Sequence, residues 1–247
     1  MGEGDIVLSH DGQYLAITGR GGSNNQLLIV STADFQVVYR DTVYTEHGSF
    51  SKDGKHFYCT AHLGTMPYYA YILDICHGYK VSTKHFSDGE VYSILPNRRD
   101  DRLYVLFQIY GELFSFRAYD AQLDSIFFDY TFCPGYGEMA IDLHENYLIF
   151  SQAGNLIGDC PAPSYFSIFD IKKSAVVAQI NTNGILGPGH LAYFPIGEIC
   201  ITPDGQHLFG ARALVGGDIF DFNLRTMKFE YAIDIGNVRE VRRVKQV

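Results

Sequence analysis

The sequence contains no tryptophan and is poor in basic residues. Its 19 Lys and Arg stand against 28 Asp and Glu in 247 residues, which gives a formal net charge of −9. Binding to a nucleic-acid backbone needs clustered cations. The one basic cluster lies at the C-terminus and comprises Arg239, Arg242, Arg243 and Lys245. We therefore expect no nucleic-acid partner, and we expect this cluster to be a solvated terminal segment.

Long apolar runs, signal-peptide features and paired cysteine motifs are also missing. No apolar run reaches the roughly 18 residues that a membrane helix needs, and the N-terminal MGEGD does not resemble a signal peptide. The cysteines form no C-x-x-C motif; they are Cys59, Cys76, Cys133, Cys160 and Cys200. Their odd number and scatter predict reduced, mostly buried thiols in a cytoplasmic protein without a membrane partner.

The chain has a fivefold internal repeat, in which a polar turn precedes an apolar strand. The copies are residues 10–15, 52–57, 99–104, 143–148 and 203–208. Asp-Gly between apolar runs predicts a hairpin, because Gly accepts the positive φ that the turn needs. The turn centres, placed at 12, 54, 101, 145 and 205, lie 42, 47, 44 and 60 residues apart. Blades of WD40-type β-propellers repeat about every 40–45 residues, so the last interval contains an insertion.

A second set of turn signals follows each of these by about two strands. Its members are Ser31, Asp74, Asp120, Asp170 and Asn223. Short polar side chains of this kind bond the backbone within turns, which predicts a hairpin between the two outer strands of each blade. The sequence thus predicts an all-β chain, a single β-propeller domain over residues 1–247 with five four-stranded blades. The blades are expected to start near Asp5, Ser49, Glu90, Glu138 and Glu198.

The segment 236–238 leaves three alternatives open for the C-terminal end. It starts a partial sixth blade, completes the first blade as a closing strand, or marks the point where a longer protein was cut. The "SKDGKHFY" and "TPDGQHLF" segments, with the later apolar strands that end in Phe-Asp, resemble the YVTN and quinoprotein-amine-dehydrogenase-like (WD40-like) propeller repeats. The resemblance covers nearly the whole chain and implies architecture. That superfamily includes enzymes, binding proteins and scaffolds, so the resemblance implies no function and no site residue.

Strand connectivity places the functional loops on one face of such a propeller. The hairpin turns share the other face, which is expected to be structural. The long segments 151–164 and 181–196 lie on the functional face, where irregular loops tend to carry function. Carboxylates that follow a glycine open most innermost strands, and we expect them to ring the mouth of the channel. Mutual repulsion there would raise their pKa, unless an arginine or a bound cation neutralises them.

These positions define the candidate site. The candidate catalytic residues are Glu90, Glu138, Glu198, His47 and His190. The candidate substrate-binding residues are Arg20, His62, Tyr110, Tyr136, Tyr193 and Arg212. The candidate ligands of a divalent metal ion are Asp5, Glu90, Glu138 and Glu198. The remaining histidines at the hairpin turns, His10, His56, His144 and His207, are expected to be solvated surface residues.

Three classes of function stay open at this point. The first, slightly favoured, is a small-molecule enzyme with acid–base or metal-assisted chemistry of the lyase, hydrolase or cyclase kind. The second is a protein-interaction scaffold that uses the same face, with a protein partner or a second copy of the chain. The third is a non-catalytic propeller that binds a small ligand or a carbohydrate. A simpler alternative for the carboxylates is that they only solvate the channel mouth and were copied by duplication.

Overall fold

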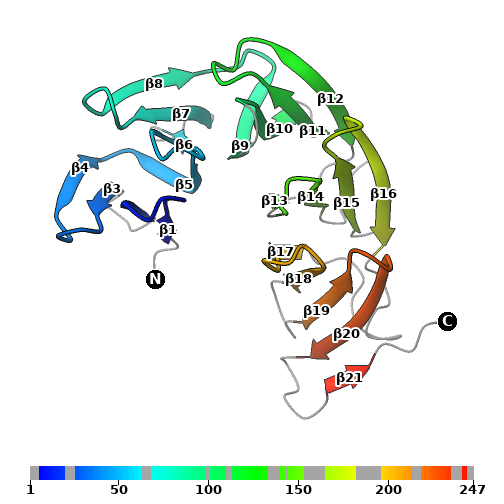
Figure 1. Cartoon of the computed structure of the whole chain (residues 1–247). Helices are drawn as coiled ribbons and strands as arrows, with labels where there is room; N and C mark the ends of the chain where they lie inside the picture. Colours follow the sequence, from blue (N-terminus) through cyan, green and yellow to red (C-terminus); the bar gives the residue numbers. More distant parts are fainter. Residues whose placement is uncertain are drawn as a thin grey trace. The chain divides into compact units, whose positions relative to one another are not determined.

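The computed structural model describes residues 6–19, 26–62, 68–97, 101–109, 113–132, 139–142, 144–152, 165–181, 196–212, 218–234 and 241–243. All the regular elements in these ranges are β-strands (Figure 1). The described part therefore contains no helix of the length and apolar character that crossing a membrane requires. The chain divides into two compact units, Met1–Phe132 and Cys133–Val247, each with its own hydrophobic core.

The first unit consists of three antiparallel sheets, each built from four consecutive strands (Figure 1). The first sheet contains β1 (Ile6–Leu8), β2 (Tyr14–Gly19), β3 (Gln26–Ser31) and β4 (Val37–Asp41). The second contains β5 (Tyr44–Phe50), β6 (His56–His62), β7 (Tyr69–Asp74) and β8 (Lys80–Lys84). The third contains β9 (Gly89–Pro96), β10 (Leu103–Ile109), β11 (Leu113–Tyr119) and β12 (Ile126–Phe132).

The second unit consists of two sheets of the same design. The fourth sheet contains β13 (Met139–Ile141), β14 (Tyr147–Gln152), β15 (Tyr165–Asp170) and β16 (Ala175–Asn181). The fifth contains β17 (Ile196–Ile201), β18 (His207–Arg212), β19 (Asp218–Asn223), β20 (Lys228–Asp234) and β21 (Val241–Arg243). Strands that are neighbours in the chain are neighbours in every sheet, as in propeller blades. The predicted all-β fold class, with five blade-like sheets, is confirmed.

The hairpin between the first two strands of a sheet is closed by a repeated hydrogen-bond motif. Ser9 Oγ donates to Asp11 Oδ1 (2.7 Å) and accepts from the Tyr14 N–H (2.9 Å). Ser51 with Asp53 and Thr202 with Asp204 repeat this pattern. The turn glycines have positive φ, for example 67° at Gly54, as the Asp-Gly signal predicted. The degenerate fourth repeat adopts the same conformation with Glu145, whose φ is 50°.

Two boundaries differ from the prediction. In the third repeat the Asn97 N–H bonds the Arg102 carbonyl, as the Ser51 N–H bonds the His56 carbonyl. Arg102, rather than Leu103, therefore corresponds to His56, so the register of the third repeat lies one residue earlier than predicted. The second sheet begins at Tyr44 rather than near Ser49, because a bulge between Thr45 and Gly48 lets the strand continue.

The C-terminal strand β21 belongs to the fifth sheet. β21 pairs antiparallel with β20, where Ala232 lies opposite Arg242, and extends the fifth sheet at its outer edge. The segment 236–238, to which the three alternatives for the C-terminal end apply, lies outside the described residues, so these alternatives stay predictions. The expected single domain, and any closure of a ring, stay predictions because they depend on how the two units are placed.

The core of each unit lies between consecutive sheets. Ala16 and Ile29 of the first sheet pack with Phe57 and Cys59 of the second. Tyr58 and Ala70, on the opposite face of the second sheet, pack with Leu103, Val105 and Phe107 of the third. Ile149 and Ile168 of the fourth sheet pack with Leu208, Phe220 and Phe222 of the fifth. We call the face that carries Tyr58 in the second sheet, and its equivalents elsewhere, the forward face.

Packing explains the glycine that precedes Glu90 at the start of β9. A Cβ on Gly89 would lie 2.1 Å from the Gln108 carbonyl oxygen and 2.6 Å from Phe107 Cε1. The first of these atoms belongs to the backbone of β10, which cannot swing away as a side chain can. Gly89 is thus required by the close approach of two paired strands.

The Gly89→Ala substitution should lower the free energy of unfolding by about 2 kcal/mol, the usual scale of overpacking in a core. The matched control is Gly19→Ala at the end of β2, where an added Cβ would meet nothing within 4 Å. Urea unfolding of both variants measures the difference. Equal stability of the two variants would contradict the packing role of Gly89.

Candidate functional site

Glu90 is the one residue of the predicted site whose side chain the structure describes. It is half-buried in β9 and lies opposite Gln108 of β10. His47, His62, Glu198 and Arg212 lie in strands β5, β6, β17 and β18, with side chains outside the described set. The others lie entirely outside the described residues; they are Asp5, Arg20, Tyr110, Tyr136, Glu138, His190 and Tyr193.

The backbone nevertheless places three of these residues along their sheets. His62 and Arg212 end their strands, and Glu90 is the second residue of β9, so each lies at the end opposite the first hairpin of its sheet. This is the end that strand connectivity predicted. The convergence of these residues into one ring stays a prediction, as does a metal ion held by it. Residues 153–164 and 182–195 of the two long predicted loops lie outside the described part of the chain.

Two predictions about cysteine and histidine environments are wrong in part. Cys59 is buried as expected, but Cys76 and Cys200 are exposed; all three are free thiols. Among the turn histidines, His10 and His144 are exposed as predicted. His207 is only 27% exposed at its side chain and pairs with a carboxylate. The cytoplasmic location and the absence of nucleic-acid and membrane partners stay predictions.

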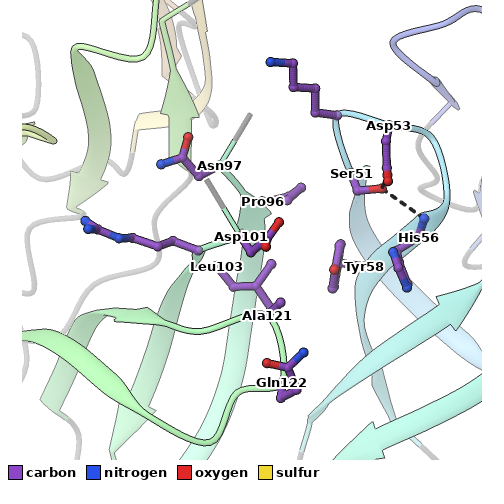
Figure 2. Close-up of a pocket in the computed structure, with 12 residues that line it drawn as sticks. Ser51, Asp53, His56, Tyr58, Pro96, Asn97, Asp101, Leu103, Ala121 and Gln122 are labelled. Atoms are coloured by element: carbon purple, nitrogen blue, oxygen red, sulfur yellow. Dashed lines mark hydrogen bonds between the residues drawn. The ribbon is translucent and has the colours of Figure 1, made fainter. Parts of the chain in front are cut away.

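A cavity of about 370 Å³ opens between the second and third sheets (Figure 2). It lies beside the first hairpins of these sheets, on the face that the sequence analysis treated as structural. Ser51, Asp53, His56 and Tyr58 line it from the second sheet. Pro96, Asn97, Asp101, Leu103, Ala121 and Gln122 line it from the third sheet, and Lys52 and Arg102 add a cation from each.

Some polar groups of this lining already form hydrogen bonds with residues near them in the chain. Asp53 Oδ1 accepts from the Ser51 hydroxyl (2.7 Å) and from the Lys55 N–H (3.1 Å). Asn97 Nδ2 donates to the Tyr104 hydroxyl (3.2 Å). These groups therefore hold the hairpins in shape, and the phenol of Tyr58 and the exposed carboxylate of Asp101 are better placed to meet a ligand.

Tyr58 reports on the electrostatics of the cavity. Only 5% of the residue is exposed, and this burial raises the pKa of Tyr58 to about 12. The negative charges of Asp53, Asp101 and Asp74 contribute to this shift as smaller causes. Tyr58 thus stays a neutral hydrogen-bonding group at neutral pH, in a negative local field.

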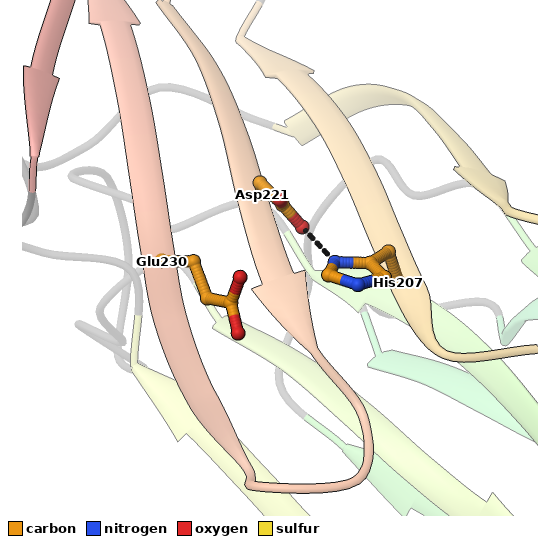
Figure 3. A group of neighbouring side chains, drawn as sticks. All are labelled: His207, Asp221 and Glu230. Atoms are coloured by element: carbon orange, nitrogen blue, oxygen red, sulfur yellow. Dashed lines mark hydrogen bonds and ion pairs between the residues drawn. The ribbon is translucent and has the colours of Figure 1, made fainter.

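A second cluster of polar groups lies on the forward face of the fifth sheet (Figure 3). His207 of β18, Asp221 of β19 and Glu230 of β20 each offer a ligand atom, and these atoms lie within 4.8 Å of one another. His207 Nδ1 lies 2.8 Å from Asp221 Oδ1, and this hydrogen bond is the main cause that raises the pKa of His207. Asn223 Nδ2 donates to Glu230 Oε1 (2.7 Å).

Sequence reasoning missed both places. The cavity depends on which residues of two sheets face each other, and the cluster depends on cross-strand register. The sequence of β19 contained a signal for the cluster, because Asp221 interrupts the apolar run between Phe220 and Phe222.

The raised pKa of Tyr58 predicts a loss of stability at alkaline pH. An unfolded tyrosine has a pKa of about 10, so the contribution of neutral Tyr58 is fully present below pH 10 and disappears as the pH rises through about 12. Between these values the free energy of unfolding of the wild type should fall more steeply than that of Tyr58→Phe. Urea titrations at pH 8, 10 and 11.5 measure this, and parallel pH profiles would rule it out.

The sequence matches no protein-family model, and no curated protein sequence matches it significantly. Solved structures do resemble it. Hydrazine synthase from Kuenenia stuttgartiensis has a TM-score of 0.59 and 13% identity, covering 89% of this chain and 76% of that chain. A chain of the mitotic checkpoint complex has a TM-score of 0.66, 14% identity and coverages of 94% and 63%. The Dos1 propeller has a TM-score of 0.63, 12% identity and coverages of 92% and 57%.

The chain therefore spans less than two thirds of the last two structures. At such low identity, the likeness shows the fold alone. An enzyme and a multi-protein complex both stand among these structures, so the comparisons favour neither class of function. They identify the chain as a β-propeller with structural similarity to WD40-type propellers and to hydrazine synthase.

Proposed function

We propose that this chain is a ligand-binding β-propeller, and that a small zwitterion with an ammonium group is bound in the cavity between its second and third sheets. The observation that supports this proposal is the neutral, buried phenol of Tyr58 within a negative field, at a cavity of about 370 Å³. A volume of this size is in the usual range for small-molecule sites, which run from about 300 to 1,000 Å³.

The field at Tyr58 favours a cationic group on the ligand. The charges that act on its phenol are the carboxylates of Asp53, Asp101 and Asp74. An ammonium group beside the ring gains from these charges and from the negative face of the aromatic system. The phenol oxygen accepts a hydrogen bond from the same ammonium group.

The cations of the lining favour a negative group at the other end of the ligand. Lys52 is exposed, Arg102 is half-buried, and both line the cavity. A carboxylate next to either of them completes a zwitterion of the size of an amino acid. Pro96, Leu103 and Ala121 supply apolar surface between the two charged ends.

Three probes of nearly equal size test the charge preference: β-alanine, propylamine and propionate. Calorimetric titration of the full chain should give the tightest binding for β-alanine, weaker binding for propylamine and the weakest for propionate. Tyr58→Phe and Asp101→Asn should each weaken β-alanine binding about five-fold or more, as the loss of a hydrogen bond or of a nearby charge does.

Glu90→Gln is the matched control for the Asp101→Asn variant. Glu90 lies in the same sheet but at the opposite end of β9, in the predicted ring of carboxylates. This variant should bind β-alanine as the wild type does. If propionate binds at least as tightly as propylamine, or if Glu90→Gln loses binding and Asp101→Asn keeps it, the proposed site is wrong.

Acid–base or metal-assisted catalysis by Glu90, Glu138, Glu198, His47 and His190 stays a separate prediction. So does a role as a protein-interaction scaffold. The Glu90→Gln variant distinguishes the catalytic prediction from the proposal, because a ring of carboxylates would respond to that substitution and the cavity would not.

A further inference from the structure

The equivalence of positions among the five sheets can be fixed by backbone hydrogen bonds. In each repeat one residue accepts, through its carbonyl, the N–H of the residue that begins the first hairpin. These accepting residues are Tyr14, His56, Arg102, Tyr147 and His207. His207 therefore occupies a position where the other repeats have Tyr, His or Arg, all of which carry polar atoms.

Asp221, at the neighbouring position on the third strand, differs in type from the residues at the same position of the other sheets. It lies opposite Phe209, which is two residues beyond His207. The residues at the same register in the first four sheets are Ile29, Ile72, Ala118 and Ile168. Four repeats thus place a hydrocarbon side chain where the fifth places a carboxylate, and the Asp221 side chain is only 12% exposed.

Glu230, on the fourth strand, also differs in type from its equivalents in other sheets. It is the extra residue of a β-bulge, since Asp221 pairs with Tyr231 and Phe222 pairs with Phe229. Three other sheets have a bulge at the same place. Their extra residues are Val38, Phe127 and Val177. The fifth repeat therefore exchanges hydrocarbon for carboxylate at two separate positions, both of which adjoin His207.

Two neighbouring carboxylates, of which Asp221 is buried and Glu230 half-buried, repel each other and lose hydration, which costs free energy unless a cation compensates. His207 compensates one of them when it is protonated. A single ion in contact with all three side chains would compensate both. We propose that His207, Asp221 and Glu230 bind one divalent transition-metal ion, with Zn²⁺ as the representative member.

The residue types suit such an ion. Imidazole binds Zn²⁺, Fe²⁺, Ni²⁺ and Cu²⁺ in preference to Mg²⁺ and Ca²⁺. Carboxylates can be ligands of all six ions. Bonds of about 2.0–2.2 Å to nitrogen and oxygen bring ligand atoms closer together than the 4.8 Å limit of this cluster. A small rotation of the Glu230 side chain closes the set. The hydrogen bond from Asn223 to Glu230 orients that ligand from outside, as is common around bound metals.

The site leaves coordination positions for water or for a ligand of another molecule, because three side chains do not fill a tetrahedral or octahedral shell. It is independent of the cavity of the first unit, since all its residues belong to Cys133–Val247. Failure of the β-alanine experiment would therefore leave this proposal untouched.

Titration with Co²⁺ tests the site in the full chain after treatment with a chelator. Visible absorption bands of protein-bound Co²⁺ should appear with a stoichiometry of one ion per chain and should be displaced by Zn²⁺. Millimolar Mg²⁺ or Ca²⁺ should not displace them. Asp221→Ile and Glu230→Val restore the residue types of the other repeats, so both should fold, and each should weaken Co²⁺ binding at least 30-fold.

The matched control is His56→Ala. His56 occupies the position of His207 in the second sheet and lies 3.8 Å from Asp74, but Ile72 stands there at the position of Asp221. The His56→Ala variant should leave the Co²⁺ bands and affinity unchanged, whereas His207→Ala should abolish them. Glu230→Gln is a second, isosteric variant in case either apolar variant unfolds. Absence of Co²⁺ and Zn²⁺ binding below about 100 μM in the wild type, or retention of binding in Glu230→Gln, would overturn the proposal.

Discussion

The register that the first hairpin imposes on each sheet determines which side chains face the preceding sheet and which face the following one. Side chains alternate between the two faces of a strand, so a shift of one residue would exchange the faces completely. The Ser/Thr–Asp–Gly motif prevents this shift: the Ser or Thr hydroxyl accepts an N–H of the next strand, and the Asp carboxylate holds the turn. The core clusters between consecutive sheets depend on this alternation.

The same constraint explains what the sequence could and could not predict. Asp-Gly signals and apolar strands located five sheets and both hairpins of each, because these features are local. The third repeat lacks Gly in its turn, and there the predicted register was wrong by one residue. That error matters more than its size suggests, because it would assign Leu103 rather than Arg102 to the forward face. Local turn chemistry alone was insufficient, and backbone hydrogen bonds were needed to correct it.

The candidate sites were harder to predict because they depend on partners distant in the chain. Tyr58 looked like an ordinary strand residue, and its raised pKa comes mainly from burial between two sheets and then from three carboxylates that the sequence does not bring together. Asp221 and Glu230 are separated by a hairpin and a bulge, so their proximity to His207 follows only from the paired strands. The Gly-carboxylate pattern at Glu90 was visible, but packing against Gln108 explains its glycine without any function.

The two sites occupy corresponding places in the repeat. His56 and Tyr58 line the cavity from the forward face of the second sheet, and His207 and Phe209 hold the same register in the fifth. In the second sheet the neighbouring third-strand residue is Ile72, and the polar groups of the cavity come from the hairpin of this sheet and from the third sheet. In the fifth sheet the corresponding residue is Asp221, so the polar group belongs to the same sheet as His207. A repeat fold allows such divergence because side chains on a fixed backbone change the chemistry of one copy and leave the architecture of the others intact.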